Sequence, residues 1–200
     1  MGRECGEQDP VMAEYQSIRA PVGAAALLFS VAYFVSDAIE AAQGGFSTGQ
    51  LALTLVAEAA IPFFVIGLYL VQLPRIGRLG AWGAAGYAAA YVFFTWTVIY
   101  PLIHDVADFE ALSDVFGVWM FLGGALMVVA GLAFGWATLR AAVLSRWSAI
   151  SLMAGVVLVA ATQGAPEGVQ LLAAGVRDLG FAAMGAALLA PVALARPRLG

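Results

Sequence analysis

Ionisable residues inside otherwise apolar stretches are where this sequence could do chemistry. Glu58 and the adjacent residues Arg177 and Asp178 interrupt two long apolar segments. A charged side chain in such surroundings costs at least about 2 kcal/mol unless it is paired or hydrated, so it normally faces the interior of a helix bundle. These residues predict either a structural ion pair between Glu58 and Arg177 or a polar pocket in which one carboxyl group stays free.

A second group of polar residues occupies one face of the first apolar segment. Ser30, Tyr33, Asp37 and Glu40 are spaced three, four and three residues apart, which stacks them on one side of a helix. Solvation at the end of a membrane-spanning helix would also account for Asp37 and Glu40. Their occurrence together with Glu58 favours the pocket.

Aromatic residues are candidates for the walls of this pocket. Trp96, Tyr100 and His104 follow one another at steps of four, on one face of a helix. With Trp119 and Phe181 they form the set that we expect to contact a substrate. For Trp96 and Tyr100, an aromatic belt at the membrane surface is the alternative.

The composition excludes several kinds of chemistry. All nine basic residues are arginines, so a retinal Schiff base has no lysine on which to form. His104 is the only histidine, which excludes a bis-histidine haem, and Cys5 is the only cysteine, which excludes disulfide exchange. The acidic run from His104 to Glu110 has the oxygen ligands that Mg²⁺ prefers, but charge runs of this kind are usually solvated loops. We therefore expect no metal and no cofactor.

Proton transfer to a hydrophobic substrate is the chemistry that remains. Burial favours the neutral form of a carboxylic acid, which can then protonate an alkene or an epoxide. Aromatic faces stabilise the carbocation that follows. Glu58 or Asp178 would donate the proton, and Asp37 or Glu40 would remove one at the end. Arg177 would hold one carboxylate ionised so that its neighbour stays protonated.

This arrangement resembles the small integral-membrane terpene cyclases of meroterpenoid pathways, in which acidic residues in an early and a late helix are thought to drive protonation-initiated cyclisation. Glu58 and Asp178 are the residues that match. The resemblance implies cofactor-independent cyclisation of a prenylated or isoprenoid substrate, with Tyr33 among the residues along the path of the cation. Fungal members of the family have seven helices, whereas six membrane spans are expected here.

A binding or transport function is the alternative. Six helices and an outward-facing pocket also resemble the substrate-capture subunits of energy-coupling-factor vitamin transporters, which dock their partner through an Ala-x-x-x-Ala pattern on the first helix. Ala20 and Ala24 have this spacing. Arg177 would then bind a ligand carboxylate, and Glu58 a ligand amine. A third interpretation is an accessory membrane subunit whose polar residues only pack the bundle.

Lipid is the expected solvent for most of the chain. Hydrophobic residues make up 62% of the sequence and charged residues 11%, against about 25% charged residues in soluble domains. The net charge of -4 and the lack of a basic run exclude a nucleic-acid partner. Six apolar stretches each approach the roughly 20 residues that a bilayer requires. They are Pro21–Ile39, Leu51–Leu73, Leu79–Ile103, Val115–Leu139, Trp147–Gln163 and Val169–Leu194.

Small residues recur where these spans should pack against one another. Gly77, Gly80, Gly83 and Gly86 repeat every third residue, and Gly131 and Gly135 are four apart. Small residues let the backbones of membrane helices approach closely, so these positions predict helix–helix contacts.

The arginines predict the orientation of the chain. Eight of the nine fall on one side of the six expected spans, and the positive-inside rule places that side in the cytoplasm. These eight are Arg3, Arg19, Arg75, Arg78, Arg140, Arg146, Arg196 and Arg198. We therefore expect an all-α bundle of six transmembrane helices over residues 19–196, with cytoplasmic tails at 1–18 and 197–200. The lysine-free, alanine-rich composition associates it with a bacterial inner membrane, and partner subunits are not predicted.

Overall fold

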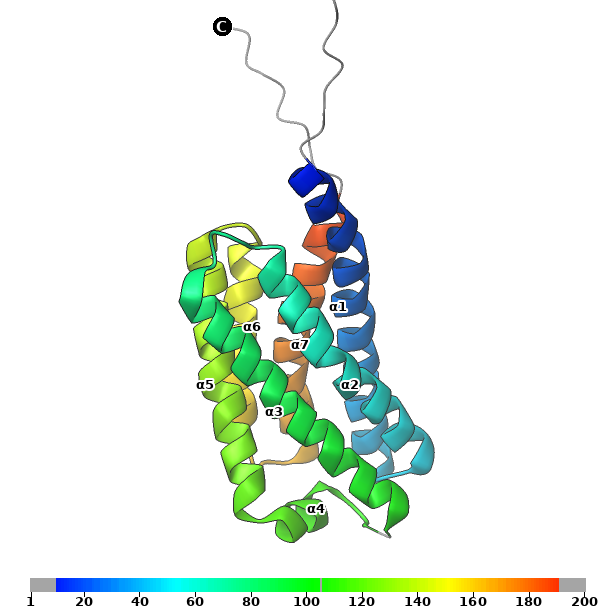
Figure 1. Cartoon of the computed structure of the whole chain (residues 1–200). Helices are drawn as coiled ribbons and strands as arrows, with labels where there is room; N and C mark the ends of the chain where they lie inside the picture. The colour runs from blue at the N-terminus through cyan, green and yellow to red at the C-terminus, as the bar shows by residue number, and fades with distance from the viewer. Residues whose placement is uncertain (1–9, 105, 191–200) are drawn as a thin grey trace, which may run out of the picture.

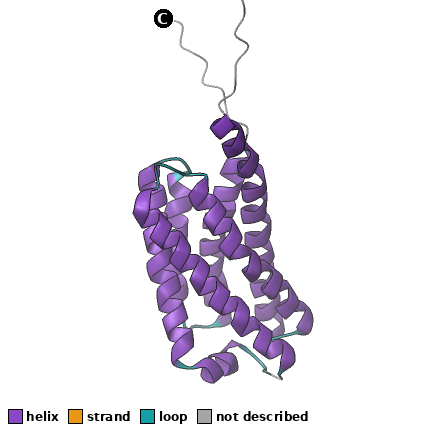
Figure 2. Cartoon of the chain, in the orientation of Figure 1, coloured by secondary structure: helices purple, strands orange, loops and turns teal. Residues whose placement is uncertain are grey.

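The chain folds into helices joined by short turns. The structure is a computed structural model that describes residues 10–104 and 106–190, and these residues contain no strand (Figure 2). The helices are α1 (Pro10–Gln43), α2 (Thr48–Leu70), α3 (Gly77–Ile103), α4 (Phe109–Phe116), α5 (Val118–Ala141), α6 (Arg146–Ala161) and α7 (Glu167–Leu189). The predicted all-α class is confirmed.

Five of the six apolar stretches overlap a single helix, whereas Val115–Leu139 covers the end of α4, the break at Gly117 and most of α5. Five helices are long and apolar enough to cross a membrane, whereas α6 has only 16 residues. The first helix begins at Pro10 rather than Pro21, within the segment expected to be a tail. The end predicted at Leu194 lies outside the described residues. The described helices thus identify an integral membrane protein.

The short helix α4 was not predicted as a separate element. Its first turn is capped by Asp108, whose side chain accepts a hydrogen bond from the backbone N–H of Ala111 at 2.9 Å. Gly117, at φ +52°, separates α4 from α5. This positive φ favours glycine. The acidic run of the loop thus contains a capped helix.

The long helices and α6 form a closed ring in the order α1, α2, α3, α5, α6 and α7, with α7 packed back against α1. Figure 1 shows that α1 begins and α7 finishes at one end of this ring, and that α4 lies across the other. We call these the terminal end and the α4 end. Arg75, Arg78 and Arg140 together line a small hollow between the α2–α3 turn and α5, at the terminal end.

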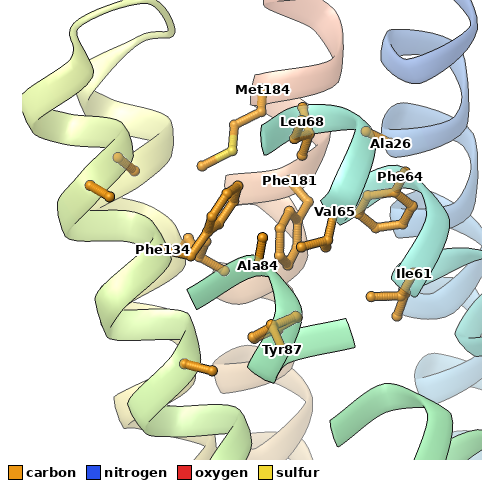
Figure 3. Packing of buried hydrophobic residues seen from close by; sticks show 14 of the residues in the cluster. Ala26, Ile61, Phe64, Val65, Leu68, Ala84, Tyr87, Phe134, Phe181 and Met184 are labelled. Atoms are coloured by element: carbon orange, nitrogen blue, oxygen red, sulfur yellow. The ribbon is translucent and has the colours of Figure 1, made fainter. Parts of the chain in front are cut away.

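The interior of the ring is filled with side chains toward the terminal end. Phe64, Tyr87, Phe134, Phe181 and Met184 are each at most 2% exposed and belong to one cluster (Figure 3). The ring of Phe181 packs against those of Phe64 and Tyr87, with centroids 5.3 and 5.4 Å apart. This aromatic layer forms a floor beneath the α4 end of the bundle.

Glycines set the closest helix contacts, as the sequence predicted, but a Cβ atom on Gly77 of the predicted set would meet no neighbour within 4 Å, and Gly155 was not predicted. A Cβ atom on Gly83 would meet the backbone of Phe134, which brings α3 against α5, and one on Gly135 would meet Met153 of α6. The tightest approach joins α6 to α7, where a Cβ atom on Gly155 would clash with the backbone of Arg177. Gly155 therefore fixes the position of the α7 turn that carries the buried arginine.

Replacing Gly155 by leucine should lower the free energy of unfolding in detergent micelles by about 1–3 kcal/mol, because the added atoms overlap α7. The matched control is Gly124→Leu on α5, since a Cβ atom on Gly124 has no neighbour within 4 Å. Equal thermal stability of the two variants would show that α6 and α7 do not pack as described.

Candidate functional site

A cavity of about 1240 Å³ occupies the α4 end of the bundle. All the helices of the ring contribute to its lining, and residues of α4 and of the α6–α7 turn lie around its mouth. The aromatic floor closes it toward the terminal end, because Tyr91 lines the cavity and its ring packs on that of Tyr87, 5.1 Å away. The site predicted from separate helices thus exists as a single space.

The cavity has one polar wall and one apolar wall. Polar residues of α1, α2 and α7 make the polar wall: Tyr33, Asp37, Glu40, Gln50, Thr54, Glu58 and Arg177. Apolar residues of α3, α5 and α6 make the apolar wall: Phe94, Val98, Met120, Phe121, Met127, Val128, Val159 and Ala160. A ligand that fits both walls is amphipathic along its length.

Glu58 is a carboxyl group of this wall that, like Glu40, has no basic partner among the described residues. It is 4% exposed, and its Oε1 accepts a hydrogen bond from the hydroxyl of Tyr33 at 2.6 Å. Its Oε2 is buried and has no hydrogen-bond partner among the described residues. A buried oxygen of this kind normally has a partner, so it requires a ligand or water in the cavity, or its own proton.

Arg177 is bound instead by its neighbour on α7. Its Nε and one terminal nitrogen donate hydrogen bonds to the two oxygens of Asp178, at 2.9 and 3.2 Å. Asp37 of α1 lies 3.7 Å from the guanidinium group, which also stands over the ring of Tyr33 at 4.7 Å. The Glu58–Arg177 ion pair considered from the sequence does not form, so Glu58 is left without a cation partner.

The two acids expected to donate the proton therefore differ in their surroundings. Glu58 lines the cavity, whereas Asp178 does not and has both oxygens engaged by Arg177. Asp37 and Glu40 line the cavity nearer its mouth. Of the four acids expected to be catalytic, three border the cavity and one supports the arginine.

A polar network around Thr54 of α2 completes the wall, and its members Gln50 and Ser36 were missed by the sequence analysis. The side-chain N–H of Gln50 donates to Glu40 at 3.0 Å and to Thr54 at 2.9 Å. Ser36 is hydrogen-bonded to Thr54 as well. The oxygen Oε1 of Gln50 is buried with no partner among the described residues. The steps of four from Gln50 through Thr54 to Glu58 place all three on one helical face, and this signal was available from the sequence.

The aromatic residues expected in the pocket are divided by the structure. Tyr33 lines it and makes an edge contact with Tyr91, whereas Phe181 lies beneath it in the floor. Trp96 and Trp119 are 67% and 63% exposed and do not line the cavity, which suits a lipid-facing belt.

The face of α3 that lines the cavity is also not the one expected. Tyr100 and His104 stack on each other at 4.3 Å, outside the cavity lining. Tyr91, Phe94 and Val98 line it instead. No group of three His, Cys, Asp or Glu side chains among the described residues is arranged to hold a metal ion.

Removing the charge of Arg177 should destabilise the bundle, because Asp178 and Asp37 would be left buried without a cation. We expect Arg177→Gln to lower the free energy of unfolding in micelles by about 3–5 kcal/mol. The double variant Arg177→Gln/Asp178→Asn should recover part of this loss. Arg146→Gln, at an exposed arginine, is the control. If Arg177→Gln unfolds like this control, the guanidinium group does not hold the acids.

Comparison with known proteins gives this arrangement no relative. No family model, no curated protein and no solved structure matches the chain. The features that bear on function are those of the cavity itself. Glu58 has no cation partner, Arg177 is already paired with Asp178, and the two walls differ in polarity.

Proposed function

We propose that this protein is a membrane-embedded, cofactor-independent enzyme that cyclises a prenylated or isoprenoid substrate by protonating it from Glu58. The observation that carries the proposal is the state of Glu58, which lines the cavity, is buried, and has one oxygen without a partner in the described part of the chain. A general acid must be held in place while its proton remains free to leave. The hydroxyl of Tyr33 holds one oxygen of Glu58 and leaves the other to carry the proton.

The reaction proceeds through carbocations. The proton of the Glu58 carboxyl group adds to one carbon of an alkene, whose π electrons form the new C–H bond and leave a cation on the other carbon. A second alkene attacks this cation to close a ring. Asp37 or Glu40 then removes a proton, which restores a double bond, and Glu58 regains its proton from water. The product is an isomer of the substrate.

The walls suit such a path. Tyr33, Tyr91 and Phe94 line the cavity, and aromatic rings stabilise cations. Arg177 carries a positive charge that would oppose a nearby carbocation, but Asp178 and Asp37 neutralise it. The apolar wall formed by α5 and α6 keeps polar side chains away from the hydrocarbon chain of the substrate.

We also propose that α6 is the sixth membrane span and that both termini are cytoplasmic. Arg75, Arg78 and Arg140 gather at the terminal end, and the positive-inside rule places such residues in the cytoplasm. Acidic residues of α4 and the start of α7 lie at the opposite end, so the cavity mouth faces outward. The composition favours a bacterial inner membrane.

Ligand capture is the second candidate function. The free oxygens of Glu58 and Gln50 would accept hydrogen bonds from the amine or hydroxyl groups of a ligand without any chemistry. Such a protein would return its ligand unchanged, whereas the enzyme returns an isomer. Analysis of small molecules extracted from the protein after incubation separates the two functions.

The Glu58→Gln variant tests the proposed reaction. Amide and carboxyl groups have similar sizes, so the fold should persist while the proton donor is lost. With linear and epoxidised isoprenoids in lipid nanodiscs, we expect cyclised product, measured by mass spectrometry, to form at least about 100-fold more slowly than in wild type.

The matched control is Asp114→Asn, at an exposed acid that does not line the cavity. It should retain the wild-type rate. Product formation by Glu58→Gln at the wild-type rate would refute the role of Glu58. Binding of the isoprenoids with no product from wild type would leave ligand capture as the function.

A further inference from the structure

We propose that the cavity opens sideways into the outer lipid layer between α5 and α6, and that its ligand is a lipid-dissolved, single-chain amphiphile whose hydrogen-bond-donor end lies on the polar wall. This inference rests on the proposed function for the identity of the site, and it adds the class of ligand and its route.

The opening follows from how α5 meets its two neighbours. The α6-facing stripe of α5 begins at Gly135 and Gly131, where added Cβ atoms would meet Met153 and Val156 of α6. The same stripe continues toward the α4 end through Val128, Gly124 and Phe121, at steps of three and four. These three residues line the cavity, and a Cβ atom on Gly124 would meet nothing within 4 Å. Contact between α5 and α6 is therefore lost in the outer half of the bundle.

The other side of α5 stays closed over the same length. A Cβ atom on Gly123, next to Gly124, would meet the ring of Phe93 on α3 at 2.7 Å. At the α4 end, then, α5 remains packed on α3 while it separates from α6. The short α6 ends at Ala161, and Val159 and Ala160 in its last turn already border the cavity.

The edge of this opening is exposed to lipid. Phe121 and Val129 line the cavity and are also 73% and 67% exposed on the apolar surface of the bundle. A residue that belongs to both surfaces marks a place where the two are continuous. The cavity therefore joins the space occupied by lipid chains, and its apolar wall extends into that space.

The polar wall selects the other end of the ligand. The oxygen Oε1 of Gln50 is buried without a partner among the described residues and accepts a hydrogen bond, and the one cation of the wall, Arg177, is already bound by Asp178. An acceptor of this kind suits a ligand that carries a hydroxyl or amine group. A phosphate or carboxylate would meet the carboxylates of Asp37 and Glu40 and would be repelled.

The probe for this inference is a farnesol analogue that carries a photoreactive diazirine on its chain, incorporated into nanodiscs that contain the full-length protein. After irradiation, peptide mapping should find adducts on the cavity-facing residues of α5 and α6, and excess farnesol should compete for them. Excess farnesyl acetate, which lacks a donor, should compete at least tenfold less well.

Gly124→Trp would fill the opening and should reduce these adducts at least tenfold. Gly49→Trp is the matched control, because a Cβ atom on Gly49 also meets no neighbour within 4 Å and this exposed residue of α2 does not line the cavity. It should label as wild type. Labelling confined to the outer helix surfaces, or labelling unaffected by Gly124→Trp, would overturn the inference.

Failure of the inference is distinguishable from failure of the proposed function. Labelling does not require proton transfer, so Glu58→Gln should still be labelled. Labelling that depends on Gly124, in a protein that forms no cyclic product, would retain the lateral opening and refute the enzyme. Cyclisation that depends on Glu58 and is unaffected by Gly124→Trp would retain the enzyme and refute the lateral opening.

Discussion

The burial of a guanidinium group inside an apolar bundle is the constraint on which the rest of the structure depends. Arg177 is 4% exposed, and a charge at that depth is tolerated only when it is compensated. Asp178 accepts two hydrogen bonds from the guanidinium group on the same helix, and Asp37 and the ring of Tyr33 contact it from α1. Gly155 brings α6 close enough to fix the helix that carries the group. These contacts join α1, α6 and α7 at one depth.

The free carboxyl group of Glu58 is a consequence of this arrangement. Because Asp178 is adjacent to Arg177 and occupies two of its donors, Glu58 on α2 is left with only the hydroxyl of Tyr33. Tyr33 contacts both groups, since its ring lies under the guanidinium and its hydroxyl binds Glu58. Asp178 is paired with Arg177 because both lie on α7, whereas Glu58 lies on α2 and is not paired with it. The cavity therefore contains a carboxyl group that can react, and the positive charge of Arg177 is balanced by Asp178 and Asp37.

Much of the fold could be predicted from the sequence because lipid imposes a simple rule. Apolar stretches of about 20 residues become helices, and each of the six expected stretches contains most of one long helix or of α6. The glycine spacing predicted close packing, because small residues leave a visible pattern. The helix α4 was missed because its eight residues lie in a polar loop where the capping by Asp108, rather than hydropathy, defines the element. The short α6 shows that an apolar stretch does not fix the length of its helix.

The site could be predicted only as far as helical periodicity reaches. The face of α1 that carries Tyr33, Asp37 and Glu40 was read correctly because those residues share one stripe. The face of α3 was not, since Trp96 and Tyr100 are as compatible with a lipid-facing belt as with a pocket, and only packing against α2 and α5 decides the rotation of the helix. The acid that pairs with Arg177 could not be predicted either. Spacing along a helix does not show whether Arg177 binds Glu58 on α2 or Asp178 beside it.

An experimental structure of the protein in lipid nanodiscs with farnesol tests the central claim most directly. The account predicts an elongated density between the two walls, with its hydroxyl within hydrogen-bond distance of Gln50, its hydrocarbon chain beside Glu58, and Arg177 still bound to Asp178. A cavity closed by side chains, with Arg177 moved onto Glu58, would contradict it.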